Sequence, residues 1–77
     1  MSHSFTTLEP GDRARVTGYR GLPNAYRNRL LSMGMTPGTE FTVTRVAPLG
    51  DPVEIALRGF RLSLRREEAK GLMVKKL

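Results

Sequence analysis

The sequence predicts a mainly β fold, a small barrel of five short strands with one inserted α-helix. Several short segments alternate apolar and polar residues with a period of two, which is the pattern of a strand with one buried face. These segments follow one another closely in a chain of 77 residues, a length that suits one domain. Closing short strands into a barrel removes exposed sheet edges. SH3-like and OB-like barrels both have the right size.

The first strand is expected over residues 13–17, where the alternation begins. Residues 8–12 before it contain Pro and Gly in positions that are typical of a turn. Residues 1–7 are largely polar and are predicted to form a flexible N-terminal tail. The single domain is therefore expected to span residues 8–77.

One α-helix is expected over about residues 23–33, inserted after the first strand. Tyr26, Leu30 and Met33 recur at positions i, i+4 and i+7, which places them on one apolar helix face. Gly34 follows as the expected residue that ends the helix.

The second half of the chain is expected to form the other four strands and a helical turn. The alternation breaks at Arg45–Val46, which indicates a β-bulge, and Arg58-Gly59 is a tight hairpin signal. The expected elements are strands over residues 40–47, 53–57 and 60–65, a short helical turn near 66–70, and a last strand over 72–74.

The chain carries no residue set that would support catalysis. Its only histidine, His3, lies in the expected tail, so no Ser–His or Cys–His pair can form on an ordered scaffold. Glu67 and Glu68 are adjacent and do not face each other on a helical turn. The lack of cysteine excludes disulfides and thiolate zinc sites. We therefore expect no enzymatic activity and no required cofactor.

The amino-terminal segment has no targeting signal and holds one metal-ligand candidate. No signal-peptide pattern occurs, and no segment approaches the roughly 20 apolar residues that span a bilayer. A cytoplasmic location without direct membrane insertion is therefore expected. His3 stands third from the amino terminus, where its imidazole and a free terminal amine can bind Cu(II) or Ni(II). Removal of Met1 destroys that spacing, so only weak transition-metal binding at His3 is predicted.

Positive charge dominates the composition, with 13 Lys and Arg against 7 Asp and Glu and a formal net charge of +6. An acidic protein, nucleic acid and an anionic membrane are all candidate partners, and solubility alone is the alternative. Nucleic acid needs exposed aromatic rings for base stacking. Tyr26, Phe41 and Phe60 are expected in the core, which leaves only Phe5 and Tyr19 free. No nucleic acid is therefore expected.

Two segments have features that a plain scaffold does not need. Met33 and Met35 flank Gly34, and flexible methionines suit adaptable contacts. The alternative is that Met33 packs in the core while Gly34 caps the helix. Leu49 lies between two prolines in the loop over residues 47–52. It is either an exposed anchor or a side chain that folds back onto the barrel.

The chain resembles the ferrous iron transport protein A (FeoA) family. The resemblance covers about residues 8–74 and rests on the segments Leu8–Gly11, Tyr26–Gly38, Arg45–Pro52 and Leu62–Arg65. It implies an SH3-like barrel in the cytoplasm with an accessory role in bacterial Fe(II) uptake. The implied partner is the membrane ferrous iron permease, which carries a cytosolic GTP-binding domain.

On this basis we expect a binding module that docks on that cytosolic G domain, at the inner face of the membrane, and modulates the permease. Arginines can pair with acidic groups of a partner, and an exposed leucine can anchor an interface. The expected contact residues are Arg27, Arg29, Met35, Leu49 and Asp51. A small basic nucleic-acid-binding barrel, a metal-binding iron chaperone and a weak homo-oligomer stay open as alternatives.

Overall fold

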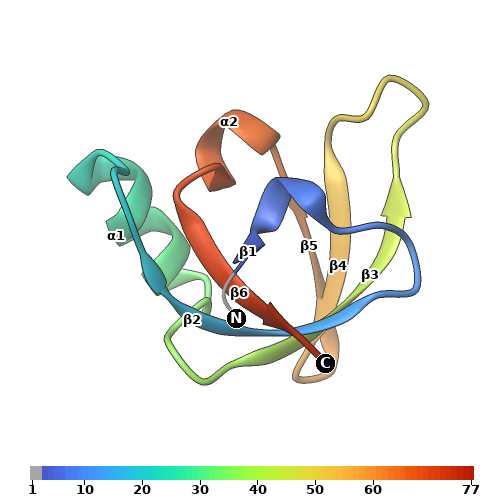
Figure 1. Cartoon of the computed structure of the whole chain (residues 1–77), viewed down its shortest axis with the longest axis horizontal. Helices are drawn as coiled ribbons and strands as arrows, with labels where there is room; N and C mark the ends of the chain where they lie inside the picture. The colour runs from blue at the N-terminus through green and yellow to red at the C-terminus, as the bar shows by residue number, and fades with distance from the viewer. Residues whose placement is uncertain (1–2) are drawn as a thin grey trace.

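The computed structural model describes residues 3–77, and Figure 1 shows its elements. The elements are the strands β1 (His3–Ser4), β2 (Arg13–Tyr19), β3 (Glu40–Val46), β4 (Val53–Leu57), β5 (Phe60–Leu64) and β6 (Leu72–Lys76), the 3-10 turn η1 (Phe5–Thr7), and the helices α1 (Asn24–Ser32) and α2 (Arg66–Ala69). The expected helix, the expected helical turn and the five expected strands are confirmed. The two-residue strand β1 is an addition.

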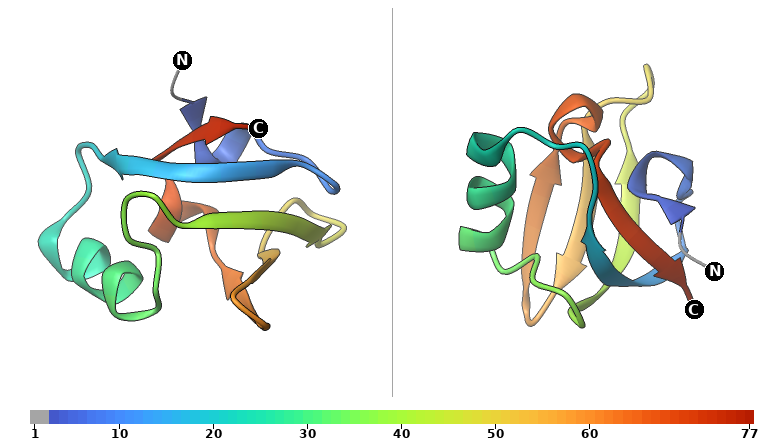
Figure 2. Two further views of the ribbon diagram at one scale, coloured as in Figure 1. Left: turned by 90° about the horizontal axis from the view of Figure 1, so that it is seen from below. Right: turned by 60° about the vertical axis from the view of Figure 1, so that its left-hand side comes forward.

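The strands form one antiparallel sheet in the order β1-β6-β2-β3-β4-β5. The sheet curls around an apolar core, with α1 to one side and α2 near one end (Figure 2). A bulge between Val43 and Arg45 confirms the expected irregularity in β3 and increases the local twist. The expectation that the strands close into a complete barrel is wrong, because no pairing joins the edge strands β1 and β5 within residues 3–77.

Helix α1 ends in a Schellman motif that turns the chain into the core. Gly34 adopts φ +94°, a conformation that glycine reaches at low cost because it has no Cβ. Its N–H donates to the Leu31 carbonyl at 3.1 Å, and the Met35 N–H donates to the Leu30 carbonyl at 3.0 Å. Leu30 is the buried residue of this helix. The prediction that Tyr26 lies on the buried face of this helix is therefore wrong, because Tyr26 is 36% exposed.

The expected flexible tail is wrong for residues 3–7, which belong to the folded domain. Strand β1 pairs with β6, and the Phe5 side chain is only 1% exposed. The Phe5 ring lies with its centroid 5.8 Å from that of Phe41. A single buried aromatic residue in a polar segment produces no periodic pattern, so its role in the core has no sequence signal. Residues 1–2 lie outside the described part of the chain.

Candidate functional site

The segment from Ala47 to Pro52, here called the Leu49 loop, joins β3 to β4 and projects at one end of the sheet (Figure 1). Leu49 at its tip is 97% exposed, so this side chain does not fold back onto the barrel. The base of the loop is closed by two hydrogen bonds. The Ala47 N–H donates to the Pro52 carbonyl at 3.1 Å, and the Gly50 N–H donates to the Ala47 carbonyl at 2.7 Å. The loop therefore presents one apolar side chain on a hydrogen-bonded turn.

Arg66, at the start of α2, connects the Leu49 loop to the rest of the fold. Its backbone N–H donates to Asp51 Oδ1 at 2.9 Å. Its side chain donates through Nε to the Gly50 carbonyl and through Nη1 to the Thr6 carbonyl at 2.6 Å. One residue thus joins the Leu49 loop, α2 and η1. We infer that Asp51, a predicted contact residue, also satisfies a free N–H at the start of α2.

Replacing Arg66 with methionine is expected to lower the free energy of unfolding by about 1–2 kcal/mol, because hydrogen bonds from a charged donor to two carbonyls are lost. The amide of Gly50 should also exchange its hydrogen faster, because the loop loses its tether. Urea unfolding and hydrogen exchange measure the two effects. Arg65→Met is the matched control, since the Arg65 side chain is exposed and has no hydrogen bond or ion pair with residues 3–77. Equal losses in both variants would contradict the tether.

The two predicted contact residues on α1 are exposed but differ in their surroundings. Arg29 Nη1 lies 2.6 Å from Glu68 Oε2 on α2, an ion pair in which Arg29 is exposed and Glu68 is largely covered. Arg27 forms no ion pair with the described residues and is free to meet an acidic group of another molecule. Helix α2 lies between α1 and the Leu49 loop (Figure 1). Arg29 and Asp51 therefore contact the same short helix from opposite sides.

The prediction that Met35 contacts a partner is wrong, because its side chain is 0% exposed. The Schellman motif turns Met35 inward, and the Tyr19 hydroxyl donates to the Met35 carbonyl. Burial raises the pKa of the Tyr19 phenol above its ordinary value, so the hydroxyl remains a donor to higher pH than an exposed tyrosine does. The sequence identified the glycine cap, but it did not show which flanking methionine would fill the core.

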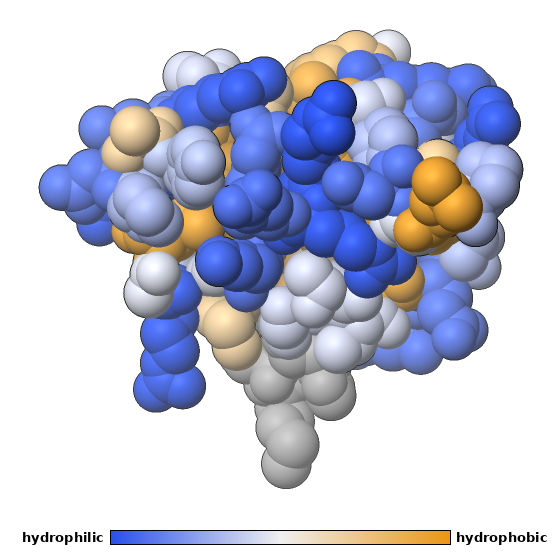
Figure 3. Space-filling view, turned by 90° about the horizontal axis from the view of Figure 1, so that it is seen from above, coloured by the Kyte–Doolittle hydropathy of each residue, from blue (hydrophilic) through white to orange (hydrophobic). Residues whose placement is uncertain are grey.

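The face that contains α2 and the Leu49 loop is mostly hydrophilic, with isolated apolar groups standing out from it (Figure 3). A shallow hollow of ≈ 250 Å³ lies at the base of the loop, lined by Arg45, Ala47, Pro52, Glu54 and Ser63. Among residues 3–77, no three His, Cys, Asp or Glu side chains gather as a metal site would require. The side chain of His3 and the terminal amine lie outside the described atoms, so metal binding at His3 stays a prediction.

A comparison with known proteins identifies the family of this chain. The model of the FeoA domain family matches residues 3–76. The chain belongs to the FeoA domain family. The family takes part in ferrous iron transport, and its SH3-like fold is the architecture found here. None of the helices described in this FeoA domain is long and apolar enough to cross a bilayer.

Three relatives show what this FeoA domain is similar to. A FeoA-like protein from Clostridium acetobutylicum is 34% identical with a TM-score of 0.89, over 99% of this chain and 87% of that one. FeoA of Stenotrophomonas maltophilia, solved with zinc and described as a prokaryotic SH3 domain protein, is 26% identical with a TM-score of 0.81, over 95% of this chain and 89% of that one. A fusion of Fe(2+) transport protein A with the Fe(2+) transporter FeoB from Porphyromonas gingivalis is 38% identical over 91% of this chain, which spans 8% of the fusion's length.

Proposed function

We propose that this FeoA domain is an accessory protein of bacterial ferrous iron uptake that binds the cytosolic GTP-binding domain of the membrane Fe(II) permease and modulates it. The observation that carries the proposal is the Porphyromonas gingivalis fusion, which joins Fe(2+) transport protein A to FeoB in one polypeptide. Covalent linkage keeps two modules at high local concentration, which suits two proteins that act in contact. In this proposal the domain is cytoplasmic, lies at the inner face of the membrane, and needs neither catalysis nor a cofactor.

The Leu49 loop supports the proposal as the anchor of the interface. Interfaces bind mainly through a few side chains that enter pockets on the partner, with polar groups around them. Leu49 is almost fully exposed, and its loop is already fixed by hydrogen bonds to Arg66. A preformed loop loses little conformational entropy on binding. Arg27 and Arg29 lie farther away on α1, where they fit the charged rim of an interface.

Replacing Leu49 with serine is expected to weaken binding to the permease's cytosolic domain by roughly tenfold to a hundredfold, because the partner no longer buries a leucine side chain. The melting temperature should stay unchanged, since 97% of Leu49 is exposed to solvent. Calorimetric titration, run with and without guanine nucleotide, measures the affinity and shows whether the contact depends on the nucleotide state.

Leu77→Ser is the matched control, because Leu77 is an exposed leucine at the carboxyl end of the chain, with 48% of its surface accessible, and lies away from the Leu49 loop (Figure 1). This variant should bind as the original chain does. If the wild-type chain does not bind the permease's cytosolic domain at concentrations of tens of micromolar, the proposed function is overturned. Binding that is unchanged in Leu49→Ser would leave the partner standing but remove the Leu49 loop from the interface.

A further inference from the structure

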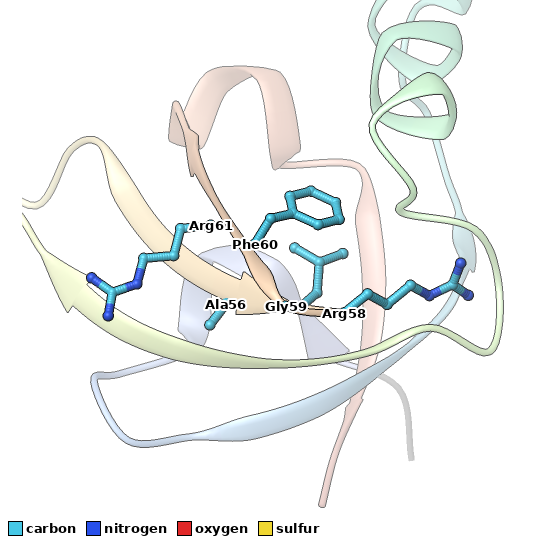
Figure 4. A pocket seen from close by; sticks show the side chains of 6 residues that line it. Ala56, Arg58, Gly59, Phe60 and Arg61 are labelled. Carbon is cyan, nitrogen blue, oxygen red and sulfur yellow. The ribbon is translucent and has the colours of Figure 1, made fainter.

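The hairpin between β4 and β5 forms a second surface, separate from the Leu49 loop. The loop precedes β4 and the hairpin follows it, so the length of β4, about 17 Å for a five-residue strand, separates them (Figure 1). A shallow hollow of ≈ 260 Å³ lies at the hairpin, lined by residues 56–61. Figure 4 shows the Phe60 ring on one side of the hairpin, with Arg58 and Arg61 extending from it in opposite directions.

Phe60 contributes an apolar surface that the fold leaves uncovered. It pairs across the hairpin with Leu57, which is 4% exposed, whereas Phe60 is 45% exposed. The alternation of residues 60–65 predicts a core position for Phe60, but at the hairpin its side chain is left half exposed. Single exposed apolar residues are common on protein surfaces, so Phe60 alone does not identify a site.

Arg58 provides the second, independent observation, because its backbone is strained. The two-residue turn has φ +46° at Arg58 and φ +82° at Gly59. Turns with two positive φ angles favour Asn-Gly, since a side chain such as that of arginine is disfavoured there. The guanidinium offsets little of this strain, because the hydrogen bond that it donates to Thr39 Oγ1 is long at 3.4 Å. Strain that local contacts do not offset is typical of functional positions.

The charge of the hollow defines the chemistry of its ligand. Its lining holds two arginines and no carboxylate. Arg61 Nη1 lies 3.6 Å from Glu54 Oε1, and a partly exposed ion pair of this length holds the guanidinium weakly. Both arginines are therefore available to donate hydrogen bonds to carboxylates in bidentate geometry.

We propose that the β4–β5 hairpin is a second docking surface, which binds an acidic protein segment. An apolar side chain of that segment packs against Phe60, and flanking carboxylates pair with Arg58 and Arg61. A protein segment fits better than nucleic acid, because single strands need several successive rings on which bases stack, and the hollow has one. The two arginines also point apart and do not form a continuous track for phosphates (Figure 4). The surface is independent of the permease contact proposed above.

The test uses a short synthetic peptide that carries glutamates around one phenylalanine, titrated into isotope-labelled protein and followed by NMR. Shifts should concentrate at residues 56–61. Arg58→Asn is the decisive variant, because asparagine suits the turn. It should raise the melting temperature by roughly 3–6 °C while it weakens peptide binding by on the order of tenfold. A gain of stability with a loss of binding separates a binding role from a structural one.

The controls isolate charge, position and ligand class. Arg65→Asn removes an equal charge at the far end of β5 and should leave peptide binding unchanged, as should Leu49→Ser at the other surface. Phe60→Ser should weaken peptide binding as Arg58→Asn does. The proposal is overturned if Arg58→Asn binds the peptide as the wild type does, or if a peptide with lysines in place of glutamates binds equally well. A single-stranded oligonucleotide that binds more tightly than the peptide, and depends on Phe60, would overturn it in favour of nucleic acid.

Discussion

Replacing Gly71 with alanine is expected to lower the free energy of unfolding by about 2–3 kcal/mol, one of the largest effects of any single methyl group in this chain. A Cβ at Gly71 would lie 2.6 Å from the Arg20 carbonyl oxygen and 2.7 Å from the Leu22 Cβ. The backbone cannot separate freely there, because the Arg20 N–H donates to the Gly71 carbonyl at 2.8 Å. The melting temperature should fall by roughly 10–20 °C in urea-free buffer.

Gly18→Ala is the control for this prediction. Gly18 lies in β2, and a Cβ built there meets no atom within 4 Å. Its substitution should change the free energy of unfolding by less than about 1 kcal/mol. Urea unfolding followed by circular dichroism measures both variants. If both glycines tolerate alanine equally, the close approach between residue 71 and the Arg20–Leu22 segment does not determine stability.

Elements with local signals could be predicted from the sequence, and those that depend on distant contacts could not. Strands β4 and β5 alternate cleanly, and Arg58-Gly59 marks the turn between them, so both strands and the turn were expected at the right places. Strand β1 is two residues long and is defined only by its pairing with β6. Nothing in residues 3–4 themselves indicates that pairing. The open side of the sheet likewise depends on which strands meet in space.

The same division applies to the candidate site. The exposure of Leu49 was an open alternative that only the structure decides, because the two flanking prolines restrict the loop but do not orient its tip. Arg66 was missed because its side-chain contacts reach carbonyls 16 and 60 positions away in the sequence. Met35 was expected at the surface and is buried, whereas Phe60 was expected in the core and is exposed. The helix cap turns Met35 inward, and the hairpin extends Phe60 beyond the core, although both residue types are common in cores.

Replacing Phe5 with alanine is expected to lower the free energy of unfolding by about 3–4 kcal/mol, which makes the amino-terminal segment essential to the fold. The ring is 1% exposed and packs beside Phe41, so its removal leaves a cavity as well as losing buried apolar surface. The effect should extend to the Leu49 loop. Phe5 begins η1, and η1 supplies the Thr6 carbonyl that accepts a hydrogen bond from Arg66.

Phe60→Ala tests whether burial is the cause, because it makes the same chemical change at a ring that is 45% exposed. It should cost only about 1 kcal/mol, since much of that ring already faces water. Urea unfolding gives both free energies, and hydrogen exchange at Gly50 reports on the Leu49 loop. Equal losses for the two variants would show that Phe5 is no more part of the core than Phe60. A larger loss for Phe5→Ala, with faster exchange at Gly50, would show that the first strand and turn hold the loop as well as the core.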